Sequence, residues 1–252
     1  MVNPPFSGST LILSFSPFLN ISFSPFLPFS MSIKNLIFDF GGVVIPLSPE
    51  KSWRRFESMG IKDARQQMGI YGQTGIFRQC EDGSIDAATF QHLLAVQAQE
   101  QSNYFGNETP HFTFEECQHA WCGYIDRVEQ YRLDNLLQLK EHYNVILLSN
   151  TNPFMVDFIE TDQFSPARHP INYYFHRVFY SCQMKDYKPS LTIFQKLLDE
   201  ACIRAEESVF LDDGPANVEA ARQLGIHGLL VPGNEDWMPS LRQFLQQHDS
   251  LF

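Results

Sequence analysis

Four groups of polar residues each follow a short apolar run in this 252-residue sequence. They are Asp39, then Ser149 with Asn150, then Lys188, and finally Asp212 with Asp213. A carboxylate such as Asp39 can attack phosphorus and form an aspartyl-phosphate. A hydroxyl group and a lysine can hold phosphate oxygens, and two adjacent carboxylates need a cation such as Mg²⁺. These residue types in this order indicate metal-dependent phosphoryl transfer with Asp39 as the nucleophile.

Each group taken alone has a simpler explanation. An aspartate at a strand end is often a turn residue or a helix cap, and Lys188 before Pro189 is an ordinary start of a helix. The hypothesis depends on all four groups standing at strand ends. The carboxyl ends of parallel strands share one edge of a sheet, and ligands bind there. Gly41 and Gly42, which follow Asp39, would let the backbone approach a phosphate or a metal closely.

Five short runs rich in β-branched or aromatic residues supply the strands that would position these groups. They predict buried strands at residues 36–40, 145–148, 178–180, 209–211 and 228–231. Helical spacing follows two of the later runs, at residues 194–201 and 218–224, and recurs at 237–247. Strands that alternate with helices predict an α/β fold with a parallel sheet covered on both faces.

The first gap between predicted strands is much longer than the others. Residues 50–135 show helical patterns at 53–59, 87–99 and 114–124, with Ser84 or Asp86 placed to cap the second of these helices. A helical insertion after the first strand would project over the strand ends and act as a lid.

Composition excludes several classes of protein. The net charge of −11 argues against nucleic-acid binding, because phosphate backbones require Lys and Arg. The five cysteines form an odd and scattered set, which predicts reduced thiols and a cytoplasmic protein rather than a disulfide framework. Nothing in the sequence specifies an oligomeric state.

Residues 1–30 differ from the rest, because they are rich in Phe, Ser and Pro and almost free of charge. This leader lacks the basic segment of a signal peptide, and its prolines interrupt any membrane-spanning helix. We expect that Met31 is the true start or that residues 1–30 form a disordered tail. A targeting or membrane-surface role is the alternative.

The motifs resemble those of the haloacid dehalogenase superfamily of hydrolases. The similar segments, which fall within residues 33–233, read IFDFGGVVI, VILLSNTNPF, KPSLTIF and VFLDDGPANVEAARQLGI. The resemblance implies a Rossmann-like core at residues 31–49 and 136–252, with a helical cap of the C1 type at residues 50–135.

The resemblance also implies roles for individual residues. Asp39, Ser149 and Lys188 would be catalytic, and Ser149, Asn150 and Lys188 would bind the phosphate of a small phosphorylated metabolite. Mg²⁺ would be held by Asp39, the carbonyl of Gly41, Asp212 and Asp213. Asn217 would orient the metal ligands rather than bind the metal itself.

One position departs from the pattern of most phosphatases in this superfamily. They carry a second aspartate two residues after the nucleophile, as general acid and base, and here that residue is Gly41. The pattern is similar to a branch that includes α-glucose-1-phosphate phosphatase. Either the leaving group needs little protonation, or a cap residue or metal-bound water supplies the proton. The cap candidates, each of which could instead be a surface group, are Arg78, Glu81, Asp82 and His92.

Two other functions fit the same motifs less well. A haloacid dehalogenase also uses an aspartate at a strand end, but it needs no metal and would lack the pair Asp212 and Asp213. A non-catalytic protein that binds a phosphometabolite or a partner is supported by Gly41 alone. Substrate contacts in the cap are sought among Trp53, Arg54, Arg55, Arg78 and Trp121, with Trp121 expected to serve packing.

Overall fold

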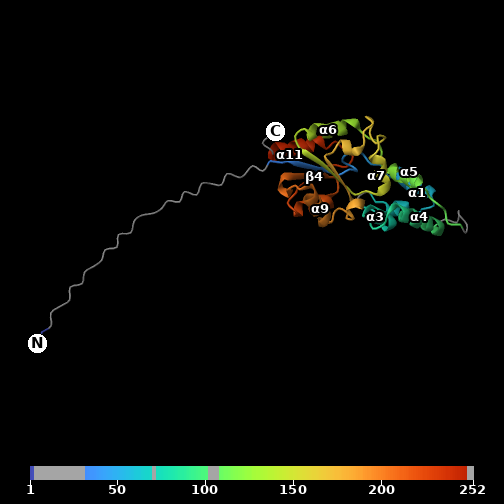
Figure 1. Ribbon diagram of the computed structural model, residues 1–252, viewed down its shortest axis with the longest axis horizontal. Helices are drawn as coiled ribbons and strands as arrows, with labels where there is room; N and C mark the ends of the chain where they lie inside the picture. Colours follow the sequence, from blue (N-terminus) through green and yellow to red (C-terminus); the bar gives the residue numbers. More distant parts are fainter. Residues whose placement is uncertain (3–31, 70–71, 102–107, 249–252) are drawn as a thin grey trace.

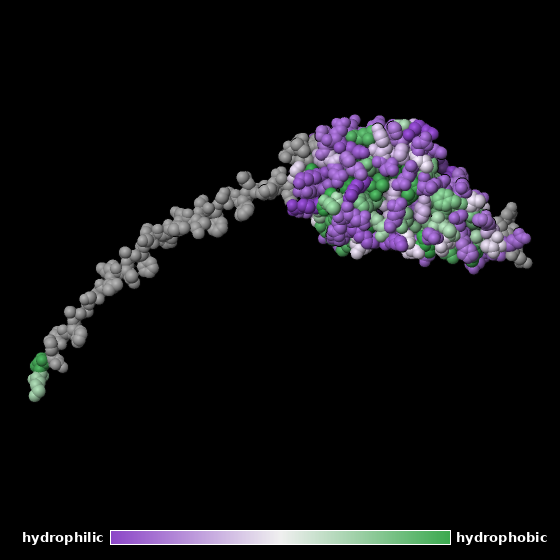
Figure 2. Space-filling model, viewed as in Figure 1, coloured by the Kyte–Doolittle hydropathy of each residue, from purple (hydrophilic) through white to green (hydrophobic). Residues whose placement is uncertain are grey.

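In the computed structural model of the chain, residues 1–2, 32–69, 72–101 and 108–248 are described (Figure 1). The leader predicted at residues 1–30 lies outside the described residues, apart from the first two. Among the residues described, no helix is long and apolar enough to cross a membrane. The face seen in Figure 2 carries mainly hydrophilic side chains, with smaller apolar areas between them.

A five-stranded parallel sheet forms the centre of the fold. Its strands are β1 (Asn35–Phe38), β2 (Asn144–Ser149), β3 (Arg177–Tyr180), β4 (Ser208–Asp212) and β5 (His227–Leu230). They lie in the order β3-β2-β1-β4-β5, and every neighbouring pair is parallel. This confirms the predicted α/β class with a Rossmann-like sheet. The first strand is shorter than predicted, because the backbone turns after Asp39 and Phe40 accepts hydrogen bonds from Val44 and Ile45.

Helices cover both faces of the sheet because the strand side chains alternate between them. Ile37 faces a buried cluster with side chains from α9 (Leu191–Ala201) and α10 (Pro215–Gln223). Leu36 and Phe38 face the other cluster, with side chains from α6 (Gln130–Lys140) and α11 (Met238–His248). Figure 1 shows α6 and α11 on one side of the sheet and α9 on the other.

The long insertion forms a group of helices beside the sheet (Figure 1). It contains α1 (Pro49–Ser58), α2 (Ala64–Gln67), α3 (Gly75–Glu81), α4 (Ala87–Gln101), α5 (Phe114–Trp121) and a 3₁₀ turn at Cys122–Tyr124. Phe56, Phe77, Phe90 and Trp121 fill its centre, with ring centroids 5.0 to 6.4 Å apart. The predicted cap at Asp86 is present, since its carboxylate accepts a hydrogen bond from the Thr89 amide at 2.8 Å.

Two chain segments connect this insertion to the sheet, and they pair with each other. Leu47 and Ile125 form an antiparallel bridge, and the Ser48 amide donates to the Tyr124 carbonyl at 2.8 Å. The predicted boundary at residue 135 falls inside α6, which packs against β2. We therefore propose that the cap consists of residues 48–124.

Arg132 on α6 holds the loop between the first strand and the cap. Its side chain is 2% exposed, and the guanidinium donates to the Val43 and Asn234 carbonyls, both at 2.8 Å. The same group pairs with Glu129 at 2.7 Å. Asn234 in turn donates to the Leu47 carbonyl and accepts from the Leu47 amide. One buried cation on α6 therefore ties the loop after β1 to the loop after β5, next to the strand ends.

Replacing this cation should destabilise the fold. Arg132→Met leaves two carbonyls without their donors, and we expect the free energy of unfolding to fall by about 3 kcal/mol, since each buried group left unpaired costs about 1–3 kcal/mol. Urea unfolding followed by circular dichroism would measure this. The control is Arg127→Met, because Arg127 is exposed and its surface ion pairs contribute at most about 1 kcal/mol. Equal losses in both variants would contradict the assigned role of Arg132.

Candidate active site

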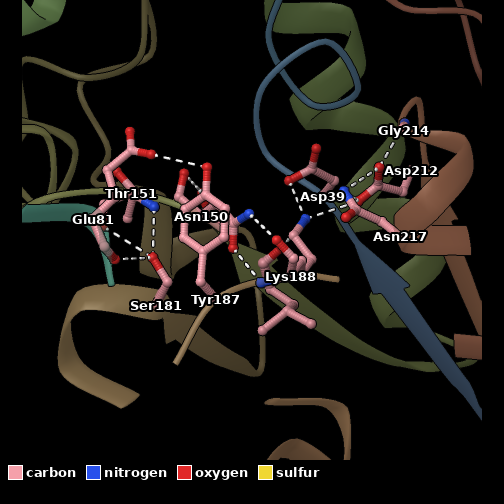
Figure 3. Close-up of polar contacts among 12 residues, drawn as sticks. Asp39, Glu81, Asn150, Thr151, Ser181, Tyr187, Lys188, Asp212, Gly214 and Asn217 are labelled. Carbon is pink, nitrogen blue, oxygen red and sulfur yellow. Dashed lines mark hydrogen bonds and ion pairs between the residues drawn. The ribbon is translucent and has the colours of Figure 1, made fainter. Parts of the chain in front are cut away.

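Lys188 lies at the centre of the site and bridges two carboxylates. Its ammonium group donates to Asp39 at 2.7 Å, to Asp212 at 2.8 Å and to the Leu148 carbonyl at 3.1 Å (Figure 3). The Lys188 side chain is 1% exposed, and that of Asp212 is fully buried. Three strand ends, those of β1, β2 and β4, therefore meet around one lysine. The predicted convergence of these groups is present in the structure.

Asp212 is held in place by several donors. One of its oxygens accepts the Gly214 amide at 2.7 Å, and the Asn217 amide group donates to both oxygens at 3.0 and 3.1 Å. With Lys188 also bound, most acceptor positions of this carboxylate are occupied. Asp212 and Asn217 thus position Lys188 and the adjacent backbone.

Asp213 lies against glycines that make room for its carboxylate. A Cβ atom at Gly42, where φ is +80°, would lie 2.3 Å from Asp213 Oδ2, and one at Gly233 would lie 2.5 Å away. Any side chain at either position would therefore displace the carboxylate. Gly42 is therefore required for two reasons: its positive φ, and the close approach of the Asp213 carboxylate.

Asp39, Asp212 and Asp213 each offer an oxygen within 4.8 Å of the others. Burial raises the pKa of Asp39 to about 7, although Lys188 opposes the shift, and burial together with Asp212 raises the pKa of Asp213 to about 6. Their negative charge is therefore costly until a cation compensates it. Carboxylate oxygens in such a group suit Mg²⁺, so the residues present fit this ion.

Ser149 and Asn150 have different surroundings at the end of β2. Ser149 is 2% exposed, and within the described part of the chain its hydroxyl makes only a long contact of 3.4 Å to the Asn150 carbonyl. The Asn150 side chain donates to the Lys188 carbonyl at 3.0 Å and accepts from the Lys188 amide at 2.9 Å. Asn150 thus fixes the backbone that carries Lys188, and the Ser149 hydroxyl retains its capacity for another partner.

A cavity of about 360 Å³ joins these residues to the cap. Gln73, Glu81, Trp121 and Tyr124 line it from the cap side, and Tyr187 lines it from the core. Of the cap residues considered from sequence, Glu81 and Trp121 line this cavity.

The other cap candidates make contacts elsewhere. Arg78 lies 3.5 Å above the Tyr187 ring and pairs with Asp82, while the Trp53 indole donates to the Met68 carbonyl. Arg54, Arg55 and His92 are likewise not among the residues that line the cavity. Gln73, Tyr124 and Tyr187 were not predicted from sequence. Of these three, only Tyr187 could have been identified from the sequence, because it directly precedes Lys188.

Glu81 is a buried carboxyl group on the cap side of the cavity. It is 6% exposed and accepts a hydrogen bond from the Tyr187 hydroxyl at 3.2 Å. Burial raises its pKa to about 8, while the hydrogen bond from Tyr187 and the positive charge of Arg78 reduce the shift. This group therefore carries a proton at neutral pH.

The raised pKa of Glu81 predicts a specific pH dependence of stability. Between the ordinary pKa of a glutamate and about 8, the folded protein keeps a proton that the unfolded chain releases, so rising pH destabilises the fold. Glu81→Gln removes this effect. Urea unfolding of both proteins should show the variant gaining on the wild type as the pH rises from 5 to 8, by up to about 1.4 kcal/mol per pH unit. A difference that does not change with pH would contradict the protonated state of Glu81.

Comparison with known proteins places this site in a family. The sequence model of the family of haloacid dehalogenase-like hydrolases matches residues 33–225 of this chain. A D-ribitol-5-phosphate phosphatase from Bacteroides thetaiotaomicron is 33% identical over 213 residues, which cover 84% of this chain and 98% of that protein.

Two solved structures are also similar. A predicted HAD-like hydrolase from Porphyromonas gingivalis has a TM-score of 0.77 and 31% identity, covering 85% of this chain and 98% of its own. A HAD family enzyme from Bacteroides thetaiotaomicron, solved with magnesium and inorganic phosphate, has a TM-score of 0.71 and 30% identity, covering 82% and 98%. Motifs, fold and relatives agree: this chain belongs to the haloacid dehalogenase-like hydrolases.

Proposed function

We propose that this hydrolase is a magnesium-dependent phosphatase that cleaves a small phosphomonoester through an aspartyl-phosphate on Asp39. The observation that supports this function most strongly is the position of Lys188. Its ammonium group lies 2.7 Å from Asp39 and 2.8 Å from Asp212, and Lys188 lines the cavity. A nucleophile, a buried cation and a group of carboxylates then meet at one point. Phosphoryl transfer needs such positioning and charge compensation more than it needs other chemistry.

The residues act in two steps. In the first, a carboxylate oxygen of Asp39 forms a bond to phosphorus, the bond from phosphorus to the ester oxygen breaks, and the departing oxygen takes a proton from solvent water. In the second, water attacks phosphorus and gives up a proton to solvent, the bond to Asp39 breaks, and inorganic phosphate leaves. Lys188 favours the ionised state of Asp39 and compensates the charge on the phosphoryl oxygens, and the Ser149 hydroxyl donates to one of them.

Asp39, Asp213 and the Gly41 carbonyl would hold Mg²⁺, with Asp212 beside them. The ion would neutralise the phosphate and the clustered carboxylates when bound. Asp212 contributes mainly by positioning Lys188, because its oxygens already accept from Lys188, Asn217 and Gly214. Asn150 has a similar supporting role, through its two hydrogen bonds to the Lys188 backbone.

The Leu47 side chain lies against Gly41, the position of the usual second aspartate. A Cβ atom at Gly41 would lie 2.5 Å from a terminal methyl group of Leu47, so an acid there would require Leu47 to move. Among the described residues that line the cavity, Glu81 is the one carboxylic acid apart from Asp39 and Asp213.

Two further observations support a substrate class and a cellular compartment. The similarity to a D-ribitol-5-phosphate phosphatase makes a polyol phosphate the first substrate to test. All five cysteines are free thiols, which supports a cytoplasmic protein.

Two changes test the mechanism. Asp39→Asn removes the nucleophile, and we expect phosphate release to fall by at least about 10³-fold, as in other enzymes that lose a covalent nucleophile. EDTA should also abolish release from the wild type, and added Mg²⁺ should restore it. A phosphate assay on D-ribitol 5-phosphate and p-nitrophenyl phosphate would measure both effects.

The matched control is Asp126→Asn, because Asp126 pairs with Arg127 outside the cavity. It should retain full activity. Phosphate release that persists in EDTA or in Asp39→Asn would overturn the mechanism. Chloride release from 2-chloropropionate without phosphatase activity would instead identify a dehalogenase.

A further inference from the structure

The cap end of the cavity contains polar groups that the phosphoryl chemistry does not use. Glu81 at the end of α3 and Tyr187 are both buried and joined by a hydrogen bond of 3.2 Å. Figure 3 shows this pair as a group separate from Asp39, Lys188 and Asp212. The two groups therefore lie at different places along one cavity.

We propose that Glu81, Tyr187, Gln73 and Trp121 form a subsite that binds hydroxyl groups on the organic part of the substrate. The enzyme would then select phosphate esters of neutral, polyhydroxylated chains over esters of plain alcohols. This inference rests on the proposed phosphatase function. The inference names the residues that would recognise the organic part of the substrate, beyond the phosphate group.

Two of these residues carry polar atoms that have no partner. Gln73 Oε1 and Trp121 Nε1 are buried and make no hydrogen bond within the part of the chain that is described. Both residues line the cavity. Because an unpaired buried polar group is costly, an acceptor and a donor left open beside a cavity point to a ligand. A hydroxyl group both donates and accepts, so it can satisfy either atom.

The charges in the cavity argue for a neutral organic group. Of the described residues that line it, Lys188 is the one lysine or arginine. The nearby Arg78 lies over the Tyr187 ring and pairs with Asp82. Arg78 is the cation next to Glu81, but it is already paired and does not line the cavity, so a second phosphate or a carboxylate on the substrate would gain no unpaired counter-charge from it. The protonated Glu81 carboxyl can instead both donate to and accept from a hydroxyl.

The subsite is fixed to the core rather than carried freely by the cap. The buried Ser181 hydroxyl donates to the Glu81 carbonyl at 2.6 Å and accepts from the Thr151 amide at 2.8 Å. Just beyond α3, a Cβ atom at Gly83 would lie 2.2 Å from the Cys182 carbonyl, so the two backbones are in close contact. The separation between Glu81 and Lys188 is therefore set by backbone contacts, and it selects for the length of the substrate.

The test compares three substrates that separate hydroxyl recognition from proton donation. D-ribitol 5-phosphate has hydroxyl groups and a poor leaving group. Pentyl phosphate has a poor leaving group without hydroxyls, and p-nitrophenyl phosphate has a good leaving group. We expect Glu81→Leu and Tyr187→Phe to lower kcat/KM for ribitol phosphate by about 10- to 100-fold, mainly through KM, and for the other two substrates far less.

Two further variants serve as controls. Glu81→Gln keeps a donor and an acceptor and should retain most of the preference for ribitol phosphate over pentyl phosphate. Glu115→Gln, the same change at an exposed residue of the cap helix α5 outside the cavity, should leave all three activities unchanged.

The outcomes separate this inference from the proposed function. Equal losses on ribitol and pentyl phosphates with p-nitrophenyl phosphate spared would make Glu81 a general acid and overturn the subsite. Equal losses on all three substrates would make its role structural and also overturn the subsite. In both cases the wild type remains a phosphatase. No release by the wild type from any of the three would overturn the proposed function and the subsite with it.

Discussion

The site depends on the concentration of negative charge at one edge of the sheet, with a single buried lysine to oppose it. Asp39, Asp212 and Asp213 lie within a few ångströms of one another, and Lys188 bonds to the first two. Such a group is unfavourable unless it is compensated, and burial makes it more so. The strand order brings β1 and β4 together, and Asn150 and Asn217 hold Lys188 and Asp212 where the charges offset. The remaining deficit of positive charge favours the binding of Mg²⁺, and the ion would in turn compensate the charge of an anionic phosphate ester.

The sheet and its strand-end residues could be predicted from sequence, because both follow from local patterns. Short β-branched runs identify buried strands, and parallel order places their carboxyl ends together. Lys188 was expected to follow a strand directly, and this was wrong, because β3 ends at Tyr180 and a short helix, α8 (Ser181–Met184), comes before the lysine. Its contacts to Asp39 and Asp212 confirm that it reaches the same edge. The division at residue 135 was taken from the spacing of predicted strands, which cannot show that α6 packs on β2.

The cap half of the cavity was much less predictable. Glu81 ends a short helix and is followed by a turn, which is typical of a surface residue, and its burial arises only where α3 meets Ser181 and Tyr187. No sequence pattern identified Gln73 and Tyr124 as cavity residues, because contacts made by the cap depend on how it packs against the core. Trp121 fills the aromatic centre of the cap, as expected, and also lines the cavity. The paired segments at Leu47 and Ile125 connect the two halves, and Leu47 also fills the space beside Gly41.

The central claim is that phosphoryl transfer passes through Asp39, and trapping the intermediate tests it most directly. The enzyme would be mixed with Mg²⁺ and a ³²P-labelled phosphomonoester, quenched in acid during turnover, and digested for peptide mapping. The account predicts label on the peptide that contains Asp39, and its loss when excess unlabelled substrate is added before the quench. Steady phosphate release with label on another residue, or with no labelled protein at any time during turnover, would contradict it.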